Sequence, residues 1–495
     1  MGEHTMKMRT IFDQRNISMM MDLYELTMAN GYFTQEQQAR RVAFDVFYRR
    51  NPDEGGFAIF AGLEQILQYL EGMHFEPDDI AYLRGLHLFS EEFLAYLSDF
   101  RFTGDVYAFP EGTVMYPNEP IITVVADLVQ AQIIETELLA QVNDQSLVAT
   151  KANRVVRAAQ GRAVSDFGAR RAHNNDAAVL GARACYIGGV TGTATVSAAQ
   201  EFDIPVGGTM AHSWVMYYQD ELTAFRKFAE VYPDNCILLV DTYDVLKQGV
   251  PNAIKVFDEM NARGIRSKNY GIRLDSGDLA YLSRESRRML DEAGYADAKI
   301  VVSNSLDEYT ITSILDQGGK IDSFGVGERM ITAKSDPVFG AVYKLCAVSN
   351  DRGEFEPRIK ISETVEKITN PGLKHVYRVY NAEGKAFADL IAGTEGVTPE
   401  QVRDGIVVID PERPWKKRLF RDCTLRELQK QVMAGGRRTE KSPSVREIAK
   451  YVRHQLDQEI WEEEQRFRNP HKHYIDMTSD YYNMKMGMLE EKAHG

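Results

Sequence analysis

Cysteine is scarce in this chain of 495 residues, which has four, at Cys185, Cys236, Cys346 and Cys423. No two of them have the CxxC spacing of a zinc ribbon or a redox motif, so we expect neither kind of site. Scattered thiols are typical of proteins in a reducing compartment. The cysteines therefore favour a cytoplasmic location.

Long hydrophobic runs are also missing. No apolar run approaches the ~18 residues that a membrane-spanning helix needs. The N-terminal segment MGEHTMKMRTIFDQRN lacks the apolar core of a signal peptide, and Thr5 does not satisfy the spacing of the myristoylation motif. We expect a soluble protein with no membrane partner.

Positive charge is in deficit, with 58 Lys and Arg against 72 Asp and Glu, a formal net charge of −14. A general nucleic-acid binder needs a basic face to offset phosphate charge, so we expect no nucleic-acid partner. The hydrophobic share of 44% and the charged share of 26% are those of an ordinary globular protein. An acidic chain can still bind a polyanionic small molecule where its cations gather locally.

Two nucleotide-binding motifs are absent: GxxxxGK[ST] does not occur, and GGVTGT and FGVGE lack the full Rossmann spacing. The glycines of these two segments nevertheless allow backbone N–H groups to approach a phosphate ahead of a helix. Tight turns between a strand and a helix are the alternative explanation.

From about residue 160 to 330, short apolar runs alternate with helical patterns. The runs end near seven markers, which are spaced 23 to 34 residues apart: Asp166, Gly189, His212, Asp241, Asp275, Asn304 and Gly327. A strand, a turn, a helix and a return loop take roughly that length. Seven such units favour a closed barrel, whose active site lies where the strands end.

The flanking regions have other patterns. Residues 1–150 predict an N-terminal α+β domain, which we expect part of 350–410 to join. Residues 151–349 predict the βα barrel, and 350–495 form a C-terminal region. Possible capping boxes at Thr424–Glu427 and Ser444–Glu447 predict helix starts, and we expect residues 424–468 to be helical. The predicted fold class is α/β: an irregular TIM-like barrel with an N-terminal α+β domain and a mixed or helical C-terminal region.

The predicted strand ends carry chemically useful side chains. Carboxylates at Asp241 and Asp275 suit Mg²⁺, ribose hydroxyls or a developing positive charge, whereas Asp278 has helix capping as its simpler role. His212, within GTMAHSW, has the chemistry of a nucleophile or an acid/base group. Arg273 lies inside a predicted strand, where its charge needs an anionic partner such as a planar carboxylate.

Phe167 can stack on a flat ring beside Arg170. The residues alone predict an enzyme that binds a phosphorylated ligand and a small planar anion, and they leave the substrate open.

The chain resembles the nicotinate phosphoribosyltransferases, which have the type II phosphoribosyltransferase fold. The segments that carry the resemblance include TMANGYF, FYRRNP, GGFAIFAGLEQIL, SDFGARRAH, GGVTGTATV, GTMAHSW, VDTYD, IRLDSGDL, SNSLDE, FGVGERMITAKSDPVFGAVYKL and KISETVEKITNPG, and they cover residues 20 to about 375 in order. The C-terminal 100 or so residues match less distinctively.

The resemblance implies an ATP-dependent enzyme of the ligase class in NAD biosynthesis. Such an enzyme joins nicotinate to phosphoribosyl pyrophosphate, giving nicotinate mononucleotide and pyrophosphate, and ATP hydrolysis drives the reaction through a phosphohistidine with Mg²⁺ present. A cytoplasmic homodimer with shared active sites is also implied.

The resemblance assigns roles to matching positions. It makes His212 the phosphorylated residue, and Asp241 and Asp275 the catalytic groups that hold ribose and Mg²⁺, directly or through water. It makes these residues substrate-binding: Tyr24 (from the partner subunit) and Phe167 on the pyridine ring, Arg170 and Arg273 for the nicotinate carboxylate or the ribose phosphate, Arg49 for pyrophosphate, and Ser303, Asn304 and Gly327 for the 5′-phosphate. Glu328 and Arg329 depart from the small residues common beside that phosphate loop.

Three alternatives compete with this interpretation. A nicotinamide-using relative would have an acidic residue in place of Ala194, where it would repel a carboxylate. A quinolinate-using relative would be much shorter. A non-catalytic, nucleotide-sensing protein on the same fold would lack polar strand ends, yet His212, Asp241 and Asp275 are present.

Overall fold

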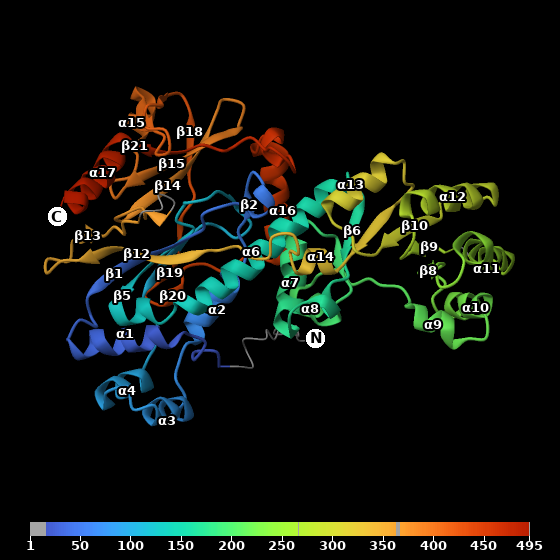
Figure 1. Ribbon diagram of the computed structural model, residues 1–495, viewed down its shortest axis with the longest axis horizontal. Coiled ribbons are helices and arrows are strands. Elements are labelled where there is room, and N and C mark those ends of the chain that lie inside the picture. Colours follow the sequence, from blue (N-terminus) through green and yellow to red (C-terminus); the bar gives the residue numbers. More distant parts are fainter. Residues whose placement is uncertain (1–15, 266, 363–366, 495) are drawn as a thin grey trace, which may run out of the picture. The chain divides into compact units, whose positions relative to one another are not determined.

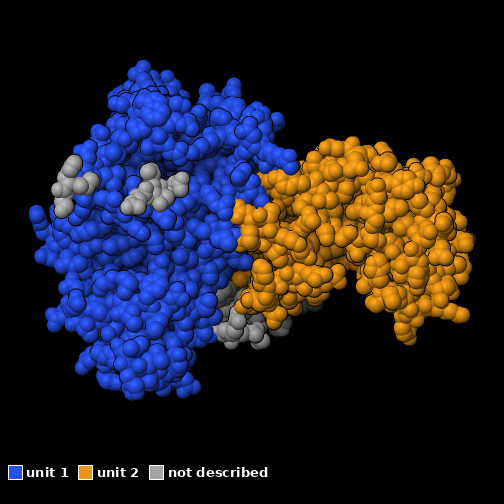
Figure 2. Space-filling view, in the orientation of Figure 1, with its two compact units in different colours: residues 1–147, 338–495 blue, residues 148–337 orange. Residues whose placement is uncertain are grey.

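The computed structural model describes residues 16–265, 267–362 and 367–494. The chain divides into two compact units: unit 1 combines residues 1–147 with 338–495, and unit 2 consists of residues 148–337 (Figure 2). The N-terminal segment examined for targeting signals, up to residue 15, and part of the KISETVEKITNPG segment lie outside the described residues.

The larger sheet of unit 1 combines strands from the N-terminal and C-terminal parts of the chain. Its strand order is β13-β12-β1-β5-β3-β19-β20, with bounds β13 Phe355–Pro357, β12 Val342–Ser349, β1 Arg41–Phe47, β5 Ile122–Asp127, β3 Asp105–Ala108, β19 Lys430–Ala434 and β20 Arg437–Arg438 (Figure 1). The side chains of β1 and β5 are buried along almost their whole length. Strands with near-continuous burial lie in a core that is covered on both faces.

A second sheet of unit 1 consists mostly of C-terminal strands. Its order is β17-β16-β21-β15-β14-β18, with bounds β17 Lys417–Phe420, β16 Ile406–Ile409, β21 Ile475–Thr478, β15 Ala386–Gly393, β14 Lys374–Tyr380 and β18 Thr424–Glu427. Two short strands, β2 Ala58–Ile59 and β4 Val114–Met115, form a separate pair.

Unit 1 also contains α-helices, both in its N-terminal part and among its C-terminal strands. Their bounds are α1 Leu23–Thr34, α2 Leu63–Gly72, α3 Pro77–Gly85, α4 Glu91–Ser98, α5 Leu128–Gln132, α15 Pro399–Asp404, α16 Val445–His454 and α17 Ser479–His494, and α6 Glu135–Ala158 runs across the boundary at residue 147. The capping box at Ser444 is confirmed, because its side chain accepts the backbone N–H of Glu447 at the start of α16.

The helix start predicted at Thr424 is wrong. Residues Thr424–Glu427 form strand β18, which pairs antiparallel with β14, and β19 and β20 occupy part of the region predicted to be helical. A threonine can begin a helix as a cap, but it also suits a β-strand. Here pairing with the distant strand β14 determines that the segment is a strand.

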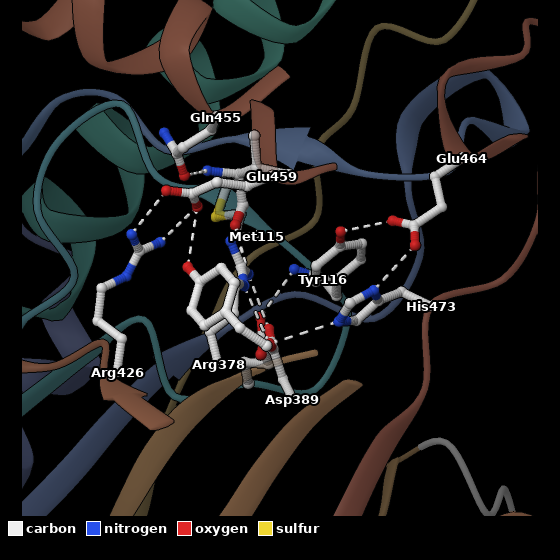
Figure 3. A network of polar contacts seen from close by, with 12 residues as sticks. Met115, Tyr116, Arg378, Asp389, Arg426, Gln455, Glu459, Glu464 and His473 are labelled. Atoms are coloured by element: carbon white, nitrogen blue, oxygen red, sulfur yellow. Dashed lines mark hydrogen bonds and ion pairs between the residues drawn. The ribbon is translucent and has the colours of Figure 1, made fainter. Parts of the chain in front are cut away.

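A buried polar network links strand residues of unit 1 to its C-terminal segment (Figure 3). Arg378 on β14 and Asp389 on β15 face each other in register and form an ion pair of 2.7 Å, with both side chains fully buried. His473 lies 3.4 Å from Asp389 and 3.1 Å from Glu464, and its ring stacks on Tyr116. The hydroxyl of Tyr116 donates to Glu464 at 2.6 Å. These contacts connect residues far apart in sequence within one core.

Unit 2 contains a six-stranded parallel sheet of order β7-β6-β11-β10-β9-β8. The bounds are β7 Gly192–Thr193, β6 Ala163–Asp166, β11 Ser323–Val326, β10 Lys299–Ser303, β9 Tyr270–Leu274 and β8 Cys236–Leu239. A parallel bridge between Thr193 and Val206 extends the sheet beyond β7. Five predicted strand ends, at Asp166, Asp241, Asp275, Asn304 and Gly327, end or follow a strand. The other two are misplaced, because Gly189 precedes β7 just after helix α7, and His212 begins α9 six residues after the bridge at Val206.

Helices connect these strands, as the predicted βα alternation requires. They are α7 Asn175–Ile187, α8 Val196–Phe202, α9 His212–Tyr217, α10 Glu221–Val231, α11 Val250–Ala262, α12 Leu279–Glu292, α13 Glu308–Asp316 and α14 Glu328–Ile331. Helices α10, α11 and α12 pack against β8, β9 and β10 (Figure 1). The predicted α/β class is confirmed. Edge strands β7 and β8 have no pairing with each other within the described part of the chain.

No helix in the described ranges combines the length and the hydrophobicity that a bilayer crossing requires.

Candidate active site

The carboxyl ends of β8, β9 and β10 bring three predicted residues together. Asp241 follows β8, Asp275 follows β9, and Ser303 ends β10. The backbone N–H of Asp275 donates to Asp241 at 3.1 Å, and the hydroxyl of Ser303 donates to Asp275. Parallel strands deliver their carboxyl ends to one edge, which explains why residues up to 62 positions apart meet there.

Arg273 occupies the centre of this cluster. Its Nε donates to Ser303 at 2.9 Å, and its Nη2 donates to Asp275 at 3.0 Å. Its Nη1 donates to the hydroxyl of Thr209 at 3.1 Å and to the carbonyl of Met210 at 3.2 Å. The guanidinium therefore connects strands β9 and β10 to the segment that precedes His212.

His212 begins helix α9 and faces the same cluster. Its Nδ1 lies 3.1 Å from the hydroxyl of Thr242, and its Nε2 lies 3.7 Å from Oδ2 of Asp275. The imidazole is partly exposed, with 39% of its side-chain surface accessible, so a reactant can reach it. A half-exposed histidine beside a carboxylate has the surroundings of a nucleophile or a proton carrier.

The two carboxylates differ in what they offer a ligand. Burial opposes ionisation of Asp275, but the hydrogen bond from Ser303 and the charge of Arg273 outweigh it and lower the pKa. In Asp241, Oδ2 accepts two hydrogen bonds, while Oδ1 is buried with no hydrogen-bond partner among the described residues.

A buried carboxylate oxygen of this kind needs a cation or a donor, so Asp241 fits Mg²⁺ better than Asp275 does. Within the described residues no group of three His, Cys, Asp or Glu side chains could hold a metal ion. The protein would therefore supply few ligands and leave the others to water and substrate phosphates, as is usual for Mg²⁺.

A flat aromatic surface adjoins the cluster. Phe167 follows β6, and its ring lies 5.5 Å from the guanidinium carbon of Arg273. Gly325 on β11 pairs in register with Ser303, and a Cβ at Gly325 would meet the Phe167 ring at 2.4 Å. The absence of a side chain at Gly325 therefore creates the place where this ring lies. Arg170, in the short helix Ala169–Arg171, is exposed.

Of the predicted phosphate-binding residues, Asn304 and Gly327 follow β10 and β11, whereas Ser303 ends β10 and bonds Arg273 and Asp275. Asn304 and Ser305 both have positive φ, of 97° and 33°, which is a costly backbone conformation for non-glycine residues and occurs often at functional turns. Gly327 precedes the four-residue helix α14. Arg329 donates to Asp307 at 2.5 Å, and Glu328 pairs with Lys334 at 2.6 Å, so both unusual charges have partners within unit 2.

The remaining two predicted residues belong to unit 1. Tyr24 lies on α1 and is 45% exposed, and desolvation and the neighbouring Glu135 raise the pKa of its hydroxyl. Arg49 lines a cavity of about 1070 Å³ whose wall also holds Arg50, Arg413, Lys472 and Lys485. The same wall holds the carboxylates Asp45, Glu54, Asp410 and Glu412, and Lys472 pairs with Glu412 at 2.6 Å, so the cavity carries charges of both signs.

Sequence reasoning marked Asp166 only as a strand end and did not single out three further polar residues near the site. Thr209 binds Arg273, Thr242 binds His212, and Ser276 donates to Asp241 at 2.6 Å. Asp166 is fully buried, and its carboxylate accepts the backbone N–H of Gly168 and the hydroxyl of Thr193. The hydroxyl groups of GTMAHSW, VDTYD and LDSGD, each next to a candidate residue, were the available signal.

Three family models match the chain. The nicotinate phosphoribosyltransferase N-terminal domain matches residues 19–143, the nicotinate phosphoribosyltransferase family matches residues 162–380, and the corresponding C-terminal domain matches residues 373–485.

Individual relatives match over most of their length. A Bacillus subtilis nicotinate phosphoribosyltransferase is 42% identical over 483 residues, covering 97% of this chain and 96% of the relative. One from Dictyostelium discoideum is 32% identical, covering 93% and 86% respectively. The crystal structure of human nicotinic acid phosphoribosyltransferase superposes with a TM-score of 0.84 at 26% identity, covering 94% of this chain and 99% of the human chain. With the strand-end cluster and this near-complete coverage, the chain belongs to the nicotinate phosphoribosyltransferase family.

Proposed function

We propose that the protein joins nicotinate to phosphoribosyl pyrophosphate, giving nicotinate mononucleotide and pyrophosphate in NAD biosynthesis. The observation that carries the proposal is the cluster of Asp241, Arg273, Asp275 and Ser303 at adjoining strand ends in a chain that matches the family over nearly its full length. In this reaction the pyridine nitrogen forms a bond to C1′ of the ribose, and the bond from C1′ to the pyrophosphate oxygen breaks.

The pyridine would bind between Phe167 and Tyr24 of a partner subunit, with its carboxylate toward Arg273 and Arg170. The side chain of Arg273 is only 12% exposed, and a buried guanidinium that faces a neutral amide lacks a matching negative charge. The site therefore favours nicotinate over nicotinamide. Ala194 is exposed beside β7 and supplies no side-chain acceptor for an amide.

Asp275 would stabilise the positive charge that develops on the ribose as the pyrophosphate leaves. A carboxylate fixed by Ser303 and Arg273 needs no reorganisation at that moment, which is the advantage of a preorganised group. Asp241, with its unpartnered Oδ1 among the described residues, is the better candidate for holding Mg²⁺. When bound, Mg²⁺ would offset the charge of the pyrophosphate.

ATP coupling would proceed through His212. Its Nε2 faces the ionised carboxylate of Asp275, which accepts but does not donate, so we assign the proton to Nε2 and the lone pair to Nδ1. In this step Nδ1 forms a bond to the γ-phosphorus of ATP, ADP leaves, and hydrolysis of the phosphohistidine later returns the free histidine. The coupled reaction places the enzyme in the ligase class.

We also propose that Arg49, Asn304 and Gly327 contact the phosphates, and that the sheet of unit 2 forms the wall of an irregular barrel. The parallel bridge between Thr193 and Val206 supports the barrel, because it adds one more backbone pairing to the β7 edge of the sheet. A homodimer with shared sites and a cytoplasmic location remain predictions.

The test is an assay of nicotinate mononucleotide formation by the purified protein, with nicotinate or nicotinamide and with or without ATP. We expect product from nicotinate, stimulation by ATP, and little product from nicotinamide. Equal use of the two pyridines would contradict the proposed carboxylate site. No product from either pyridine would contradict the proposed activity.

A further inference from the structure

The main chain that leads into His212 is held by the arginine that is proposed to recognise the substrate carboxylate. Thr209 and Met210 stand three and two residues before His212, and both accept hydrogen bonds from Nη1 of Arg273. On the other side of the same guanidinium, Asp275 accepts from Nη2 and also lies beside Nε2 of His212. Arg273 thus bonds the segment before His212 directly and also bonds the carboxylate that lies beside the His212 ring.

The donors of Arg273 are almost fully occupied. An arginine side chain has five N–H bonds, and here one goes to Ser303, two to Thr209 and Met210, and one to Asp275. A bidentate bond to a planar carboxylate takes two N–H groups in parallel. Arg273 therefore engages nicotinate in this way only if one of its present partners gives up a hydrogen bond.

The partners differ in how firmly they are fixed. Ser303 is buried at the end of β10, and Asp275 carries a full negative charge, which makes its bond to the guanidinium the stronger kind. Thr209 and Met210 offer neutral oxygens. They follow Gly207 and Gly208, which are exposed and have no other atoms within 4 Å of the position that a Cβ would take. Thr209 is partly exposed whereas Met210 is buried, so the bond to the Thr209 hydroxyl is the one most easily exchanged.

We propose that Thr209 is a positioning residue that couples recognition of the pyridine carboxylate at Arg273 to the position of His212. Nicotinate competes with Thr209 for Nη1, so its binding releases the segment that carries the histidine. Because coupling between two sites is reciprocal, the position of His212 in turn alters the affinity for nicotinate. The inference rests on the proposed function and adds a specificity-determining role that depends on one hydroxyl group.

The test uses Thr209→Val, which removes the competing hydroxyl at nearly the same volume, and Thr209→Ala, which removes it with less bulk. Thr209→Ser restores the hydroxyl. Thr312→Val is the matched control, because the hydroxyl of Thr312 donates to the Glu308 carbonyl within helix α13, outside the cluster. Thermal unfolding compares the folded state of all four variants with that of the wild type.

We expect the KM for nicotinate to fall roughly fivefold in Thr209→Val and Thr209→Ala, because a competing acceptor is gone. We also expect the yield of acid-labile phosphate on His212 to depend on nicotinate in the wild type, Thr209→Ser and Thr312→Val. In Thr209→Val and Thr209→Ala, the phosphate yield with nicotinate divided by the yield without it should move to about one, which is the value for uncoupled sites. Local damage alone would instead raise the KM.

Two results would overturn the inference. One is a folded Thr209→Val and Thr209→Ala pair with wild-type KM and wild-type nicotinate dependence. The other is a wild type whose phosphorylation does not respond to nicotinate. If the wild type formed no nicotinate mononucleotide, the proposed function would fail and the inference with it. If the wild type formed the product and the Thr209 variants had its KM and its nicotinate dependence, only the inference would fail.

Discussion

His212 is the residue whose substitution we expect to separate energy coupling from transfer. Its imidazole lies between Thr242 and Asp275, while the groups proposed to bind ribose and pyridine are other side chains. We expect His212→Ala to abolish ATP stimulation and the acid-labile phosphate, and to leave some phosphoribosyl transfer. Labelling with radioactive ATP followed by acid treatment measures this, and equal labelling of wild type and variant would place the phosphate elsewhere.

Single residues at the site were predictable where the sequence places them at strand ends. Asp241 and Asp275 are predicted in this way, whereas Ser303 follows only from the family resemblance, and the structure brings all three within hydrogen-bonding distance. Thr209 and Thr242 were not found, because threonine hydroxyls are common in loops and their value here comes from distant partners, Arg273 and His212. Spacing along the chain does not encode such contacts.

At the scale of one strand, Gly325 determines where the Phe167 ring lies. A Cβ on Gly325 of β11 would approach that ring to 2.4 Å, closer than real side chains allow, and the half-buried ring would have to move. We expect Gly325→Ala to keep the fold and to lower kcat/KM for nicotinate between about tenfold and a hundredfold, since small misplacements cost that much. Steady-state kinetics with nicotinate measures the effect.

Gly487→Ala is the control for this substitution, because its Cβ would meet no atom within 4 Å in helix α17. Wild-type kinetics in Gly325→Ala would show that the position of the Phe167 ring does not matter for catalysis.

The strand pair β14 and β15 has a buried ion pair at its centre (Figure 3). Burial opposes ionisation of Asp389, but Arg378 and His473 outweigh it and hold the pKa of Asp389 well below its usual range. Arg378→Met would leave Asp389 buried without its main partner, at a cost of about 3–5 kcal/mol in the free energy of unfolding. Denaturant titration measures this, and Arg378→Met combined with Asp389→Leu should recover much of the loss, because no unpaired charge is then left at Asp389.

The stabilisation that the Arg378–Asp389 pair contributes should decrease as the pH falls. A lowered folded-state pKa means that the stabilisation is complete above the unfolded value of about 3.9 and is lost as the pH falls below it. Wild-type stability should therefore decline on the acid side, and the decline should be shallower in Arg378→Met. An unchanged acid slope would show that Asp389 is not the group responsible.

Elements with strong local patterns were predictable, and elements defined by distant partners were not. Helix α16, for example, begins at the predicted capping box of Ser444. Residues Thr424–Glu427 carry the same kind of local signal but pair with β14 as a strand. The C-terminal strands β19 and β20 likewise extend a sheet whose central strands are N-terminal, a pairing that local sequence cannot specify.

For the whole molecule, the proposed residues are divided between two units. Tyr24 and Arg49 belong to unit 1, and His212, Arg273 and Asp275 belong to unit 2. We predict a symmetric homodimer in which unit 1 of one chain completes the site of the other, since an isologous interface builds two such sites at once. Light scattering tests the oligomer, and a fully active monomer would contradict it.

A mixed dimer tests whether the two chains share their sites. Arg49→Ala and Asp275→Asn should each inactivate the enzyme, the first through pyrophosphate binding and the second through the loss of a preorganised charge, worth about 2–4 kcal/mol in the barrier. In a dimer with one chain of each kind, shared sites place both substitutions in one site and leave the other site intact. Such a dimer, co-expressed with two different tags and purified through both, should have about half of the wild-type activity. Sites built within a single chain would each carry one substitution, and the mixed dimer would then be as inactive as either parent.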